Sequence, residues 1–114
     1  MDKTFRPKKL SPPPPEGYIT GMTVDASVGK EISGPLAVVS FCGDQPFTTQ
    51  AVNLYWEPPT AWETGYLFGQ KNREVYGRHT YTKAGTYTLY IRVAVACADG
   101  WFDAAKGEST IIVK

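Results

Sequence analysis

The sequence contains few of the residues from which catalytic and metal centres are built. Its 114 residues include one histidine, His79, and two cysteines. It has no Cys/His cluster with zinc-binding spacing and no glycine-rich phosphate loop. No serine or cysteine nucleophile and no acid stands at motif spacing from His79. The sequence therefore predicts a protein that is not an enzyme and that needs no metal or cofactor.

An excess of one charge and long apolar runs are also missing. Twelve Lys and Arg residues against eleven Asp and Glu residues leave a formal net charge of +1. This charge gives no electrostatic indication of a nucleic-acid partner, and none is expected. The longest uninterrupted apolar run is only a few residues, so we expect neither a transmembrane span nor membrane insertion.

A secretory signal is not visible, because Met1 leads into a polar, proline-rich segment. Residues 1–16 contain four basic side chains and the prolines of 12–15, which favour an extended polyproline arm. This arm is interpreted either as a flexible linker or as a basic segment that docks on an acidic partner surface. The chain is then either an excised module of a larger exported protein or a complete small protein, such as a virion component.

Aromatic residues and alternating segments are abundant, with seven Tyr and three Trp in the chain. Their abundance and the scarcity of methionine favour β-structure. Residues 86–97 give the strongest signal, because apolar and polar residues alternate strictly through most of the segment. This long strand places five side chains on one buried face: Tyr87, Leu89, Ile91, Val93 and Val95.

Six further segments have strand-like composition and are separated by turn residues. They are 18–24, 36–41, 52–56, 66–68, 74–76 and 107–113. About seven strands without a helical pattern predict that residues 17–114 form one all-β domain, an immunoglobulin-like sandwich of two sheets. Trp56 and Leu89 are expected to be buried and to lie in facing sheets. Tyr87 is expected to form a tyrosine corner, in which its hydroxyl bonds to nearby backbone.

Residues 79–93, HTYTKAGTYTLYIRV, resemble the closing half of a PKD domain, a family of immunoglobulin-like β-sandwich modules. Residues 34–41 resemble the second strand of that family, and residues 54–56 resemble the strand that carries its central Trp. The family usually continues with Asp-Phe-Gly-Asp-Gly, which is absent from residues 57–62. The resemblance implies that His79 is structural. It also implies contacts with proteins or polysaccharides through loops and sheet faces.

Cys42 and Cys97 lie at the ends of two predicted strands, which run in the same direction in facing sheets of an immunoglobulin-like sandwich. The cysteines are 97 − 42 = 55 residues apart, and Trp56 follows Cys42 by 56 − 42 = 14 residues. This spacing is compatible with an inter-sheet disulfide packed on Trp56. However, Cys42 points outward if Phe41 points inward, and a chain that is not secreted keeps its thiols reduced. The sequence leaves both states open.

Four aromatic residues are candidates for a binding surface: Trp62, Tyr66, Trp101 and Phe102. Trp62 follows two prolines, and Trp101 and Phe102 lie in the loop before the last strand. Exposed aromatic residues at such places mark binding surfaces. The alternative is that the loops fold over the edges of the sandwich and bury these rings. Tyr55 and Tyr90 are predicted to point outward from their strands.

Acidic residues are scattered over the loops, and calcium takes its oxygen ligands from such loops. Asp99 and Asp103 flank Trp101, and Asp44 is expected at the same end of the domain. No spacing matches a recognised calcium loop, so a solvated polar loop is expected here.

Taken together, these patterns predict a non-catalytic binding or spacer module of an extracellular, cell-surface or virion-surface assembly, which makes protein–protein contacts. One alternative is a carbohydrate-binding module that stacks Trp62, Tyr66 and Trp101 on sugar faces. Another is a small phage-type decoration protein whose basic arm binds a capsid.

Overall fold

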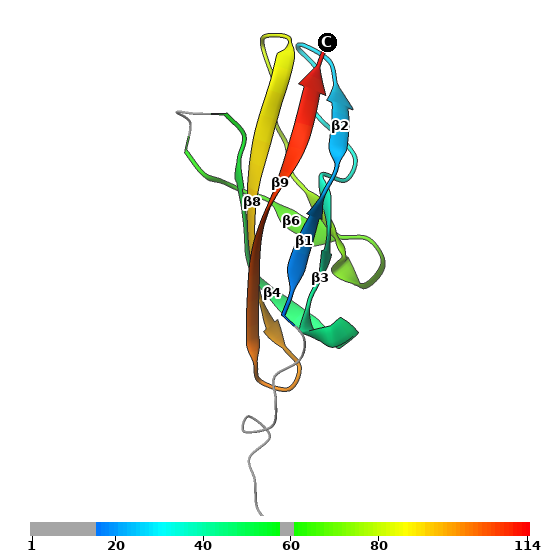
Figure 1. The fold of residues 1–114 in the computed structure, drawn as a ribbon, viewed down its shortest axis with the longest axis vertical. Coiled ribbons are helices and arrows are strands. Elements are labelled where there is room, and N and C mark those ends of the chain that lie inside the picture. The colour runs from blue at the N-terminus through cyan, green and yellow to red at the C-terminus, as the bar shows by residue number, and fades with distance from the viewer. Residues whose placement is uncertain (1–15, 58–60) are drawn as a thin grey trace, which may run out of the picture.

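The computed structural model describes residues 16–57 and 61–114. In these residues nine strands form two facing sheets (Figure 1). Residues 1–15 of the predicted arm lie outside the described part of the chain. Two short 3-10 turns are present, η2 (Cys42–Asp44) and η3 (Gln70–Asn72). The strands are β1 (Tyr18–Gly21), β2 (Thr23–Ala26), β3 (Ala37–Ser40), β4 (Phe47–Tyr55), β5 (Glu63–Thr64), β6 (Tyr66–Phe68), β7 (Glu74–Tyr76), β8 (Gly85–Cys97) and β9 (Phe102–Val113).

The two sheets confirm the predicted all-β sandwich. The four-stranded sheet has the order β1-β3-β7-β6, and the five-stranded sheet has the order β2-β9-β8-β4-β5. The described residues contain more strands than the seven or so expected, because the first predicted strand is divided and the short β5 was not indicated by the sequence. Within the described residues, no helix is long and apolar enough to cross a membrane.

The first predicted strand, residues 18–24, changes sheets at Met22. β1 pairs antiparallel with β3, whereas β2 pairs parallel with β9. The Met22 N–H donates to Ser109 Oγ over 3.1 Å, and the Met22 carbonyl accepts the N–H of Thr110 over 2.9 Å. A Cβ at Gly21 would lie 1.7 Å from the Glu108 carbonyl oxygen, so the chain can approach β9 here only because position 21 is glycine.

β8 is flanked by strands on both sides. It is in register with β9 from Gly85 to Ala96 and with β4 from Tyr90 to Cys97. The predicted alternation is confirmed, because Leu89, Ile91, Val93 and Val95 are buried and Tyr87 is half-buried. The Tyr87 hydroxyl donates to the Lys83 carbonyl over 2.8 Å, which is the expected tyrosine corner.

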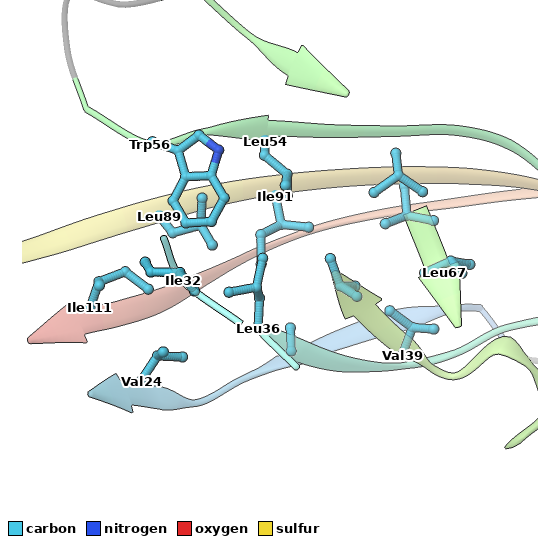
Figure 2. Close-up of a cluster of buried hydrophobic side chains, with 14 of the residues drawn as sticks. Val24, Ile32, Leu36, Val39, Leu54, Trp56, Leu67, Leu89, Ile91 and Ile111 are labelled. Atoms are coloured by element: carbon cyan, nitrogen blue, oxygen red, sulfur yellow. The ribbon is translucent and has the colours of Figure 1, made fainter. Parts of the chain in front are cut away.

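The core lies between the sheets, as Figure 2 shows. Leu54 and Trp56 on one side and Leu36 and Val39 on the other are almost fully buried. Trp56 and Leu89 are buried as predicted, but the prediction that they lie in facing sheets is wrong. Trp56 directly follows β4, which is the hydrogen-bonded neighbour of β8 in the five-stranded sheet.

The second predicted strand, residues 36–41, begins one residue late as β3. Leu36 precedes the strand and donates its N–H to the Val75 carbonyl over 2.7 Å. Within β3, Val39 is buried and Val38 points to the outer face. The apolar residues therefore do not all point the same way, and no bulge inside β3 is needed to accommodate them.

A disulfide joins Cys42, after β3, to Cys97, at the end of β8, and so links the two sheets. The left-handed turn of η2 places Phe41 and Cys42 both inside, with φ of 60° at Cys42. This turn replaces the strand alternation that would have pointed Cys42 outward. Trp56 is at the other end of β4, because Phe47 is the residue paired with Cys97. The disulfide therefore does not pack on Trp56.

Replacing Leu89 by Ala should lower the free energy of unfolding by about 2–5 kcal/mol, because a fully buried side chain is truncated and leaves a cavity. Urea denaturation measures the change. Thr88→Ala is the matched control, because Thr88 is the exposed neighbour on the same strand. A loss below about 0.5 kcal/mol for Leu89→Ala would contradict the inward orientation of this side chain.

Candidate functional site

The outer face of the five-stranded sheet is ordered in rows by the register of its strands. Cross-strand partners have their side chains on the same face. One row contains Tyr55, Tyr90 and Glu108, and the next row contains Asn53, Arg92 and Lys106. The row after that consists of three alanines, Ala51, Ala94 and Ala104. This face therefore changes from aromatic to charged to small apolar side chains along the strands.

The aromatic row is covered at one side by Trp62. The Trp62 ring stacks on Tyr55, with ring centroids 5.2 Å apart and 25° between their planes. Tyr55 and Tyr90 have centroids 6.2 Å apart. The guanidinium carbon of Arg92 lies 4.0 Å from the centroid of the Trp62 ring, which is a cation–π contact. Trp62 remains 40% exposed in this arrangement.

These side chains line an open groove, with Tyr55, Trp62 and Tyr90 on its aromatic side and Arg92, Lys106 and Glu108 on its charged side. Arg92 and Lys106 also line a second hollow, whose floor includes Ala51, Ala94 and Ala104. The two hollows therefore adjoin along the outer face. A groove with aromatic rings at one end and a few polar groups beside them has the composition of a ligand-binding surface.

The outer face of the four-stranded sheet carries a second aromatic group, from β6 and β7. Tyr66 stacks on Tyr76 at 5.8 Å between centroids, and Phe68 meets Tyr76 edge-on at 6.0 Å. Phe68 is 62% exposed, and Val38 on β3 is also exposed. The Tyr76 hydroxyl donates to Glu74 Oε1 over 2.9 Å, and this hydrogen bond to a carboxylate raises the pKa of Tyr76. We call Val38, Tyr66, Phe68 and Tyr76 the β6–β7 patch.

The disulfide end carries Trp101, which ends the tight turn between β8 and β9, and Phe102, the first residue of β9. The Trp101 N–H donates to Asp99 Oδ1, and the Trp101 carbonyl accepts the N–H of Cys97. The Trp101 side chain is half-buried against the core. Phe102 begins β9 and is 77% exposed.

Asp103 fixes the chain at this end. Its Oδ1 accepts the N–H groups of Gly17 and Ala104, and its Oδ2 accepts the N–H of Cys42. Asp103 also lies within 4.8 Å of the two cysteine sulfurs, measured between ligand atoms. Both sulfurs are held in the disulfide, so this cluster is explained by structural bonds. Asp44 is at the same end and pairs with Arg73 at 3.7 Å.

His79 packs among aromatic rings near the end of β4. Its ring stacks on Trp56 at 5.0 Å between centroids and meets Tyr81 edge-on at 4.6 Å. Its Nε2 lies 2.5 Å from Glu57 Oε2. The Tyr81 hydroxyl donates to the Trp56 carbonyl over 3.2 Å, and burial raises the pKa of Tyr81. These contacts give His79 a structural setting.

The four sequence-predicted binding residues do not form one surface. Trp62 belongs to the groove on the five-stranded sheet and Tyr66 to the β6–β7 patch, because the chain crosses between sheets at Gly65, between β5 and β6. Trp101 and Phe102 stand at the disulfide end. The sequence did not indicate Arg92 or Lys106 as binding residues. Alternation within the strands places Arg92 outward, but its position opposite Lys106 depends on register.

No protein-family model and no curated protein sequence matches the chain.

Replacing Trp101 by Ala should lower the free energy of unfolding by about 1–3 kcal/mol, because its half-buried indole contacts the core. Thermal or urea unfolding measures the loss, and Phe102→Ala is the control because Phe102 is largely exposed. Unchanged stability in Trp101→Ala would show that the indole does not support the core, and would favour the binding role for this turn.

Proposed function

We propose that the chain is a non-catalytic, PKD-like binding or spacer module of an extracellular, cell-surface or virion-surface assembly, and that it makes protein–protein contacts. The observation that carries this proposal is the β6–β7 patch, where large apolar side chains stand exposed together on one sheet face. Patches of this kind on a folded domain mark protein interaction surfaces, and aromatic residues are enriched in them.

Two further observations support the proposal. A disulfide persists in oxidising surroundings, so the Cys42–Cys97 bond favours a location outside the cytosol. Two of the residues that resemble a PKD domain make contacts that stabilise the fold. Tyr81 and Tyr87 have ring centroids 4.2 Å apart, and Tyr87 forms the tyrosine corner. These contacts support the PKD-like interpretation of residues 79–93.

A photo-crosslinking amino acid at position 68 should form an adduct with a partner protein from the extracellular fraction of the source cells, because Phe68 projects from the β6–β7 patch. The same amino acid at Thr86, exposed on β8, is the matched control. Val38→Glu, which introduces a charge into the patch, should reduce the adduct at position 68. Equal adducts at positions 68 and 86, or an adduct unaffected by Val38→Glu, would contradict a protein contact at this patch.

We propose carbohydrate binding as a second candidate function, located at the groove on the five-stranded sheet. The observation that favours it is the group of Tyr55, Trp62 and Tyr90 beside polar side chains. The C–H-rich face of a sugar ring is apolar and packs against aromatic rings, while its hydroxyl groups need polar partners. The stacking residues of this proposal differ from the trio expected from the sequence, because Tyr66 and Trp101 lie elsewhere.

Trp62→Ala should weaken polysaccharide binding by roughly thirtyfold, because an aromatic anchor contributes about 2 kcal/mol or more at a binding site. Affinity electrophoresis in gels that contain soluble polysaccharides measures the change. Tyr66→Ala is the control, since Tyr66 is an exposed aromatic residue of the other sheet. Equal effects of the two substitutions would contradict this location of the site.

A further inference from the structure

Arg92 and Lys106 form a pair of like charges that the fold itself does not explain. They are direct cross-strand partners on the outer face, and like charges in this position are mutually repulsive. Among the described residues, no carboxylate is within ion-pair distance of either side chain. Glu108 is nearby on β9, yet it forms no salt bridge with Lys106. Two exposed cations therefore meet on the groove without an ion-paired partner, although Glu108 lines the aromatic part and Glu16 lines the alanine-floored part.

The position of Arg92 leaves its hydrogen-bonding groups available. Its guanidinium carbon is 4.0 Å from the centroid of the Trp62 ring. A guanidinium that stacks on a ring keeps its N–H donors in the guanidinium plane, where they can bind a carboxylate with two parallel hydrogen bonds. In the described part of the chain, the Arg92 side chain donates no hydrogen bond to a protein acceptor. The contact with Trp62 thus holds a donor group that no atom of the described residues uses.

The groove is longer than a site for one small molecule. Its aromatic part and its alanine-floored part share Arg92 and Lys106. From Tyr90 to Ala94 is four residues along β8, or about 13 Å at ~3.3 Å per residue. The alanine side chains keep the floor low, so a chain that lies along the groove can pass beyond the cations. An extended polymer fits this shape better than a compact ligand.

We propose that this groove binds an extended polysaccharide of uronic-acid sugars. Sugar faces pack on the exposed rings of Trp62 and Tyr90, and the carboxylates of the polymer pair with Arg92 and Lys106. This inference rests on the second proposed function and specifies the chemistry of its ligand. Two cations beside Glu108 match a polymer with one charge per sugar. A polyphosphate or a heavily sulfated chain carries more charges per unit length than two cations can pair.

The test uses the full chain and measures binding to polygalacturonate by affinity electrophoresis and isothermal titration calorimetry. The combined substitution Arg92→Gln and Lys106→Gln should weaken binding at least tenfold and should make the remaining binding less sensitive to salt. The control is Arg78→Gln with Lys83→Gln, which removes the same charge from exposed positions outside the groove. The unfolding midpoint of the groove variant should change little, because relief of the like-charge pair offsets loss of the Arg92–Trp62 contact.

Neutral xylan, heparin and a single-stranded oligonucleotide complete the panel. Preferential binding of polygalacturonate that depends on Arg92 and Lys106 supports the inference. If xylan binds equally well and its binding still depends on Trp62, the inference of an acidic ligand would be overturned. The proposal of carbohydrate binding would then remain. Absence of binding to polygalacturonate and xylan would overturn both, and preference for heparin or the oligonucleotide would also overturn the inference. Equal losses in the groove and control variants would show a non-specific charge effect and would overturn it as well.

Discussion

The pairing of β8 with two long neighbours is the constraint on which the rest of the molecule depends. Its register with β9 and β4 decides which side chains enter the core and which stand on the outer face. A shift by one residue would expose Leu89 and Ile91 and would bury Tyr90 and Arg92. The same ladder therefore positions the core and the groove, and neither can change register without the other.

The two ends of the sandwich are closed by different means. At one end a disulfide and the Asp103 carboxylate hold the turns together. Near the other end Trp56 and His79 stack, and Tyr87 bonds to the Lys83 carbonyl. Aromatic and charged side chains that the core does not use gather on the outer faces of both sheets, and Phe102 stands exposed at the disulfide end.

Much of the fold could be predicted from the sequence, because alternation and turn residues report local structure directly. The long strand, the inward Leu89 and the tyrosine corner follow from such local signals. The sheet change at Met22 and the left-handed turn at Cys42 could not be predicted, since both depend on contacts with distant segments. The groove could not be predicted for the same reason. Alternation within the strand gives the outward direction of Arg92, but the register between β8 and β9 sets its position opposite Lys106.

The proposed saccharide-binding groove on the outer face of the five-stranded sheet depends on the register of β8. The most direct measurement is a chemical-shift map of the isotope-labelled protein titrated with oligogalacturonate. We expect shifts at the Trp62 indole and at the backbone amides of Arg92, Ala94 and Lys106, with little change at Phe68. Shifts confined to the β6–β7 patch or to the disulfide end, or no shifts at saturating ligand, would contradict it.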